Sequence, residues 1–133
     1  MKPDHSGPLA AFEAGALDPK CFHHLDHLRV SYELLERYRF PEALLHLARG
    51  LRKLAAKAGR PEAYHETVTA AFLALIAERR LKDDCRRWED FAERNPDLLR
   101  KDLLQDWYEP EILQSKIARE TFLLPRLVMA PKG

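Results

Sequence analysis

PEALLHLARGLRKLAAKAGRPE, residues 41–62, is the stretch that decides the fold class. Its first two residues, proline and glutamate, are typical of a first helical turn, and apolar residues then recur at helical spacing from Ala43 to Ala55. Gly59 is a typical C-terminal stop, and Pro61 starts another helical pattern almost at once. The stretch therefore predicts two helices that are joined by a connection of only a few residues.

The same signals, followed outward along the chain, predict an all-α fold. Strand-like alternation is scarce, so we expect a small single-domain bundle of about five helices with short loops. The first three helices should pack as antiparallel neighbours because their connections are short. The expected helices cover residues 18–39, 41–59, 61–80, 83–93 and 97–108, with one short turn at 110–111.

Length and composition are those of one ordinary globular domain. The chain has 133 residues, of which 46% are hydrophobic and 32% charged, and this is long enough to bury one hydrophobic core. We expect residues 18–125 to form the helical bundle domain. Residues 1–17 are then an N-terminal extension, and residues 126–133 are a C-terminal tail.

The charge balance argues against a nucleic-acid partner. There are 22 basic and 21 acidic residues, for a formal net charge of +1, whereas affinity for phosphate backbones needs a clear basic excess. No apolar run approaches the roughly 18 residues of a membrane span, and we see no signal peptide. Two cysteines are too few for a disulfide framework. We therefore expect a reduced, cytoplasmic protein without nucleic-acid or membrane partners, and the oligomeric state stays open.

Three of the six histidines fall within CFHHLDHL, residues 21–28. A helix turns about 100° per residue, so each side chain can be assigned to a face. With Leu28 at the centre of the apolar stripe, His24 lies about 40° from the centre and His27 about 100° from it. His23 lies near 140° and points mostly outward, by the same rough count.

The third expected helix adds one more inward histidine. His65 lies about 65° from the middle of its apolar stripe, whereas His46 on the second helix points away from the core. Cys21 also faces inward if the first helix reaches that far. Because the first turns of helices one and three lie at the same end of an up-down bundle, we expect His24, His27 and His65 to converge.

Three neutral imidazoles are good ligands for a divalent ion, zinc above all, with an open position for water. Such an ion lowers the pKa of the bound water, and a metal-dependent hydrolase or lyase is then the default function. Two alternatives stay open. Without metal, the same histidines can act as general acid and base. If instead each inward histidine is bonded to a carbonyl or carboxylate, the protein is a non-enzymatic interaction module whose histidines are structural.

Four motifs together resemble an uncharacterised family of small helical bacterial proteins. The resemblance covers about residues 20–125 and supplies no reaction. The motifs are HHLDHL at 23–28, YHET at 64–67, NPDLL at 95–99 and WYEPEILQSKIAR at 107–119. The resemblance implies one constellation of His24, His27, His65, Glu66, Thr67, Ser115 and Arg119.

The resemblance also implies two candidate catalytic residues. Arg119 is a fixed cation that suits the carboxylate or phosphate of a small anionic ligand, unless it forms only a surface salt bridge. Glu66 can act as a base, or orient a histidine, only if the third helix begins irregularly. The family's pattern has serine where this chain has Glu109, so a role for that hydroxyl does not carry over.

Overall fold

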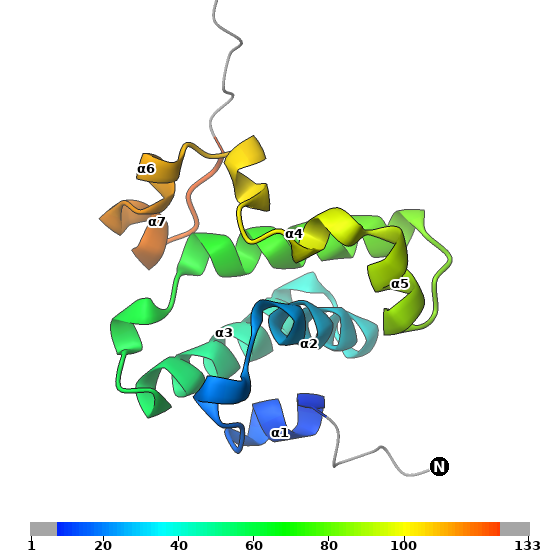
Figure 1. The fold of residues 1–133 in the computed structure, drawn as a ribbon, viewed down its shortest axis with the longest axis horizontal. Helices are drawn as coiled ribbons and strands as arrows, with labels where there is room; N and C mark the ends of the chain where they lie inside the picture. The colour runs from blue at the N-terminus through cyan, green and yellow to red at the C-terminus, as the bar shows by residue number, and fades with distance from the viewer. Residues whose placement is uncertain (1–7, 126–133) are drawn as a thin grey trace, which may run out of the picture.

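The computed structural model describes residues 8–125, and within that range the fold is all-α without a strand. Five helices of seven or more residues pack as a small bundle, as the sequence predicts (Figure 1). They are α1 (Pro8–Ala14), α2 (His24–Arg37), α3 (Phe40–Lys57), α4 (Glu66–Lys82) and α5 (Trp88–Arg94). Two shorter helices, α6 (Pro110–Leu113) and α7 (Lys116–Glu120), follow them.

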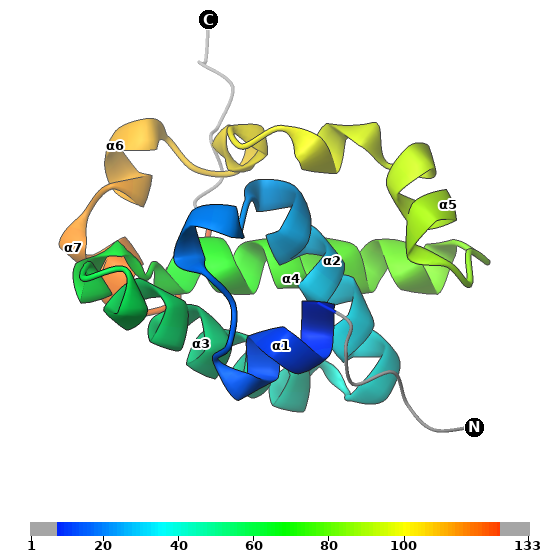
Figure 2. The same ribbon diagram turned by 60° about the horizontal axis from the view of Figure 1, so that its bottom comes forward.

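The three long helices form the centre of the bundle, and α2, α3 and α4 each contact the other two. The helices α3 and α4 run in broadly opposite directions, and α2 crosses them (Figure 2). As expected, α3 stops at a glycine, because Gly59 has a φ of 75° that other residues rarely adopt. Fully buried side chains such as Tyr32, Phe72 and Leu47 fill the space between these helices. None of the helices within residues 8–125 is long and apolar enough to cross a membrane.

The first helix, α1, is packed into the bundle although the sequence assigns it to the N-terminal extension. Leu9 and Phe12 lie three positions apart, which puts them on one face of the helix, and both are buried. Phe12 stacks on Phe22 with ring centroids 5.6 Å apart, and it lies directly against Gly50 of α3. Residues 126–133, the expected tail, lie outside the described residues.

The first expected helix begins later than predicted. Asp18 does act as an N-cap, but it caps only a short 3-10 segment, η1 (Pro19–Cys21), where its carboxylate accepts from the Lys20 N–H at 3.0 Å. The chain then becomes extended, and α2 begins at His24. The condition under which Cys21 would face inward is not met, because α2 does not reach this residue, and its side chain is exposed.

The third expected helix is also interrupted near its start. Pro61 begins only a 3-10 segment, η2 (Pro61–Ala63), after which Tyr64 and His65 are extended. The continuous helix over residues 61–80 is therefore wrong in its first turn, and α4 begins at Glu66. This irregular start is the condition under which Glu66 can reach a functional site.

The fourth expected helix is present only over its second half, as α5, and short segments replace the fifth. Residues 83–87 are not helical, and residues 97–108 contain two 3-10 segments, η3 (Pro96–Leu99) and η4 (Leu103–Asp106). Leu98 and Leu103 are both buried, yet on one α-helix they lie about 140° apart, so a single face cannot bury both. Separate short segments can turn each leucine toward the core.

Candidate functional site

His24 links α2 to the η3 segment. Its Nε2 atom lies 2.9 Å from the carbonyl oxygen of Leu98, and because a carbonyl only accepts, the ring must donate there. The ring also meets Phe72 of α4 edge to face, with centroids 5.1 Å apart. The inward direction predicted for His24 is thus observed, and its partner is a backbone carbonyl.

His27 is more deeply buried than its predicted place on the flank of α2, because Phe72 of α4 covers that flank. The ring centroids of His27 and Phe72 are 6.3 Å apart, and those of His27 and His24 are 6.4 Å apart. The Nε2 atom of His27 is buried and has no hydrogen-bond partner among the described residues. Burial, and secondarily the positive charge of His24, lowers the pKa of His27 to about 4.

His65 is the N-cap of α4. Its Nδ1 atom accepts a hydrogen bond from the Val68 N–H at 3.2 Å, and its Nε2 atom donates to the carbonyl oxygen of Leu113 at 2.6 Å. Both ring nitrogens are therefore engaged. The Nδ1 atom caps the N-terminus of α4, and the Nε2 atom binds the backbone of the segment that leads into α7.

The three histidines take separate positions along α4. His24 and His27 lie against Phe72, which is seven residues beyond His65, or roughly 10 Å along the helix axis. Residues 8–125 contain no group of three or more histidine, cysteine, aspartate or glutamate side chains that could hold a metal ion. The three-histidine ion site therefore stays a prediction from the sequence, and the observed hydrogen bonds of His24 and His65 are to the backbone.

The last residue of the YHET motif, Thr67, binds the C-terminal part of the described chain. Its hydroxyl donates to the carbonyl oxygen of Thr121 at 2.8 Å and accepts from the Leu123 N–H at 2.9 Å. Thr67 is fully buried. Together with His65, it fastens α6, α7 and the following residues to the start of α4.

Other residues of the predicted constellation also have local structural roles. Ser115 is the N-cap of α7, where its hydroxyl accepts from the Ala118 N–H at 3.3 Å. Glu109 is the N-cap residue of α6 without a side-chain cap bond. His23 is exposed as predicted, whereas His46 is only partly exposed and stacks on Tyr38 with centroids 4.2 Å apart.

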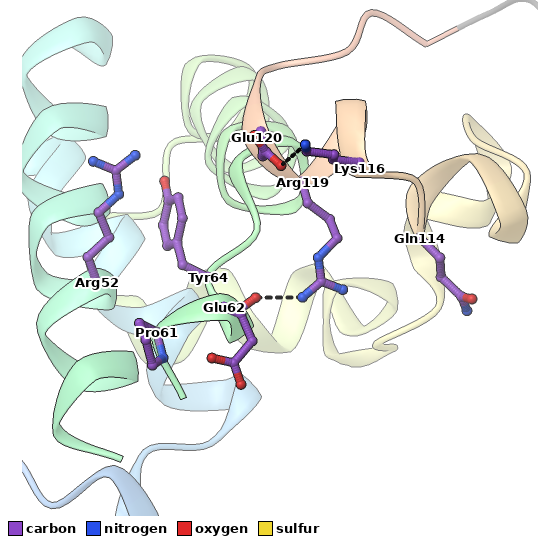
Figure 3. Close-up of a pocket in the computed structure, with 8 residues that line it drawn as sticks. All are labelled: Arg52, Pro61, Glu62, Tyr64, Gln114, Lys116, Arg119 and Glu120. Atoms are coloured by element: carbon purple, nitrogen blue, oxygen red, sulfur yellow. Dashed lines mark hydrogen bonds and ion pairs between the residues drawn. The ribbon is translucent and has the colours of Figure 1, made fainter. Parts of the chain in front are cut away.

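A cavity of about 720 Å³ opens where the end of α3, the η2 segment and α6–α7 meet (Figure 3). This volume is within the range of roughly 300–1,000 Å³ that is typical of small-ligand sites. The predicted residue Arg119 is on its wall. The complete lining is Arg52, Pro61, Glu62, Tyr64, Gln114, Lys116, Arg119 and Glu120.

Three cations and two carboxylates line this cavity, and the cations differ in how far they are neutralised. The Nζ atom of Lys116 lies 3.8 Å from the carboxylate of Glu120, with both side chains largely exposed. Arg119, by contrast, forms no ion pair with a described carboxylate. Its Nη2 atom donates to the backbone carbonyl of Glu62 at 2.5 Å, which fixes the guanidinium without cancelling its charge.

Tyr64 forms the aromatic wall of the cavity and connects it to Glu66. Its hydroxyl donates to the Glu66 carboxylate at 2.6 Å, and the guanidinium of Arg52 stacks over its ring at 4.8 Å from the centroid. Burial and the neighbouring Glu66 raise the pKa of Tyr64 well above its usual range. The phenol therefore stays protonated at neutral pH and acts as a donor.

Of the three cations that line this cavity, only Arg119 is a candidate functional residue from the sequence. Lys116 lies within the same motif, three residues before Arg119 on α7, but Arg52 carries no motif and joins them only through tertiary contacts between α3 and α7, which lie far apart in the chain. Glu66, the other candidate catalytic residue, lies beside the cavity, and its carboxylate is 3.9 Å from Arg52. Within residues 8–125, the contacts of the Glu66 carboxylate are with Tyr64 and Arg52 and not with a histidine ring.

Comparison of the chain with protein-family models, curated proteins and solved structures finds no match. The resemblance to a bacterial family therefore remains a prediction, and the function has to be argued from the cavity and its residues.

Proposed function

We propose that this protein is a small helical binding module that takes an anionic small molecule into the cavity beside Arg119. The histidines of the HHLDHL and YHET motifs hold the fold together. The observation that carries the proposal is the position of Arg119 on the wall of a ligand-sized cavity, without a carboxylate partner among residues 8–125.

The contacts of Arg119 suit it to bind an anion. A guanidinium carries five N–H donors in a fixed plane, and one nitrogen is held by the Glu62 carbonyl. The remaining donors can form paired hydrogen bonds with a carboxylate or phosphate. Because the anchor is a neutral carbonyl, the full positive charge is kept for the ligand.

A metal-dependent hydrolase or lyase is the second candidate, and it stays a prediction from the sequence. To bind an ion, His65 would have to give up either the Val68 N–H or the Leu113 carbonyl, because these engage both of its ring nitrogens, whereas His24 could keep its bond to Leu98 and bind through Nδ1. Either exchange at His65 leaves a buried polar group without a partner. The binding module needs no such rearrangement.

Replacing Arg119 with glutamine is expected to weaken the binding of glutarate and of inorganic phosphate about tenfold or more, because charge-assisted hydrogen bonds are the stronger ones. Isothermal titration calorimetry at low ionic strength measures this, and added salt should weaken binding to the parent protein. Arg86→Gln is the matched control, since Arg86 is exposed in the loop between α4 and α5. Equal affinities of the Arg119 and Arg86 variants, or no binding of any small anion to the parent, would overturn the proposed function.

A further inference from the structure

We propose that the ligand carries two anionic groups joined by a short spacer, one bound by Arg119 and the other by Arg52. This inference rests on the proposed function, because it names the class of anion that the same cavity takes. The two guanidinium groups come from separate helices, α7 and α3, and both line the cavity.

The arrangement of the two arginines favours two separate anionic groups. In Figure 3 the side chain of Tyr64 lies between Arg52 and Arg119. Arg52 is held over the Tyr64 ring, whereas Arg119 is held at the Glu62 carbonyl on the other side. Because the two guanidinium groups are held by different partners with the Tyr64 side chain between them, two anionic groups joined by a spacer suit them better than one.

Arg52 is available for a ligand because its existing contacts are weak. Its ion pair with Glu66 is 3.9 Å long, and 65% of the Arg52 side chain is exposed. Such exposed pairs contribute little to stability. Glu66 also accepts the short hydrogen bond from Tyr64, so its carboxylate keeps a partner when Arg52 turns toward a ligand.

The rest of the lining restricts the ligand to a short one. Tyr64 and Pro61 provide apolar surface against which a methylene spacer can pack. Glu62 and Glu120 add two negative charges to the same cavity, and these repel the continuous charge of a polyanion. A small dicarboxylate fits this pattern, and a small diphosphate shares the same chemistry.

The test uses isothermal titration calorimetry to compare ligands with two anionic groups, called dianions below, with related ligands that carry one such group, called monoanions below. Glutarate is compared with pentanoate, adipate with hexanoate, and pyrophosphate with inorganic phosphate. At least one dianion should bind about tenfold more tightly than its monoanion, because the second contact is intramolecular once the first has formed. The dicarboxylate and phosphate arms show which chemical source is preferred.

The variants Arg52→Gln and Arg119→Gln separate this inference from the proposed function. Each should reduce the affinity for the preferred dianion to about that of the monoanion, while Arg86→Gln leaves it unchanged. Equal binding of dianions and monoanions, or an Arg52→Gln variant with parental affinity, would overturn the two-anion inference and leave the anion site intact. If no anion binds to the parent, both proposals fail.

Discussion

Acidification from pH 7 to pH 4 is expected to lower the free energy of unfolding by about 3 kcal/mol through His27 alone. In the unfolded chain this imidazole takes up a proton below its ordinary pKa of 6.5, whereas in the folded protein it does so only below about 4. Between these values the unfolded state binds more protons, so stability falls as the pH falls. Urea unfolding at several pH values measures the loss.

The replacement His27→Leu isolates this effect. Leucine keeps the buried volume similar and removes the unpartnered Nε2 atom, so the variant should equal or exceed the parent's stability at pH 7 by up to about 1 kcal/mol. Between pH 7 and pH 4, the free energy of unfolding of the variant should fall by about 3 kcal/mol less than that of the parent. His23→Leu is the matched control, because that side chain is 74% exposed. A His27→Leu variant with the parental pH dependence would contradict the burial of His27.

Truncating Phe12 to alanine is expected to cost about 3–5 kcal/mol of stability, the usual range for a buried aromatic ring. Phe12 is only 1% exposed and packs between Phe22 and Gly50. If residues 1–17 were instead an extension outside the bundle, the change would be under about 0.5 kcal/mol, as at surface positions. Urea or thermal unfolding therefore decides whether α1 belongs to the cooperative unit.

A double-mutant cycle with Gly50 gives this test its control. A methyl group added at Gly50 would overlap the Phe12 ring, so Gly50→Ala alone should destabilise by roughly 1–3 kcal/mol. When Phe12 is already alanine, the added methyl group no longer overlaps the Phe12 ring, and the same change should cost much less. Additive effects within about 0.5 kcal/mol would mean that the two residues do not touch in solution.

The helices that the sequence predicts best are those whose start, stop and apolar spacing agree. The signals around Pro41 and Gly59 match α3 closely, because the buried residues Ala43, Leu47 and Leu54 share one face of a regular helix. Over residues 97–108 the leucines do not share a face, and tertiary contacts decide the conformation. There the guanidinium of Arg79 on α4 donates two hydrogen bonds to the carboxylate of Asp97, at 2.6 and 2.7 Å.

The candidate site was harder to predict than the fold because it depends on where α4 begins. Pro61 and Glu62 form a strong start signal, yet the helix begins five residues after Pro61, at Glu66, and is capped by His65, although histidine is not among the residues preferred as N-caps. That shift moves His65 away from His24 and His27. It also brings Tyr64 and Glu66 beside Arg52, which no local pattern in the sequence indicates.

The central claim, that the histidines are structural and that the cavity beside Arg119 binds anions, is tested most directly by one ¹H–¹⁵N NMR titration. Untagged, metal-free protein is titrated first with zinc and then with glutarate, and both backbone amides and imidazole nitrogens are observed. We predict that zinc leaves the rings of His24, His27 and His65 unchanged, while glutarate shifts the amides of Tyr64 and Arg119. Zinc shifts on all three rings, with no response of the cavity amides to glutarate, would contradict the account.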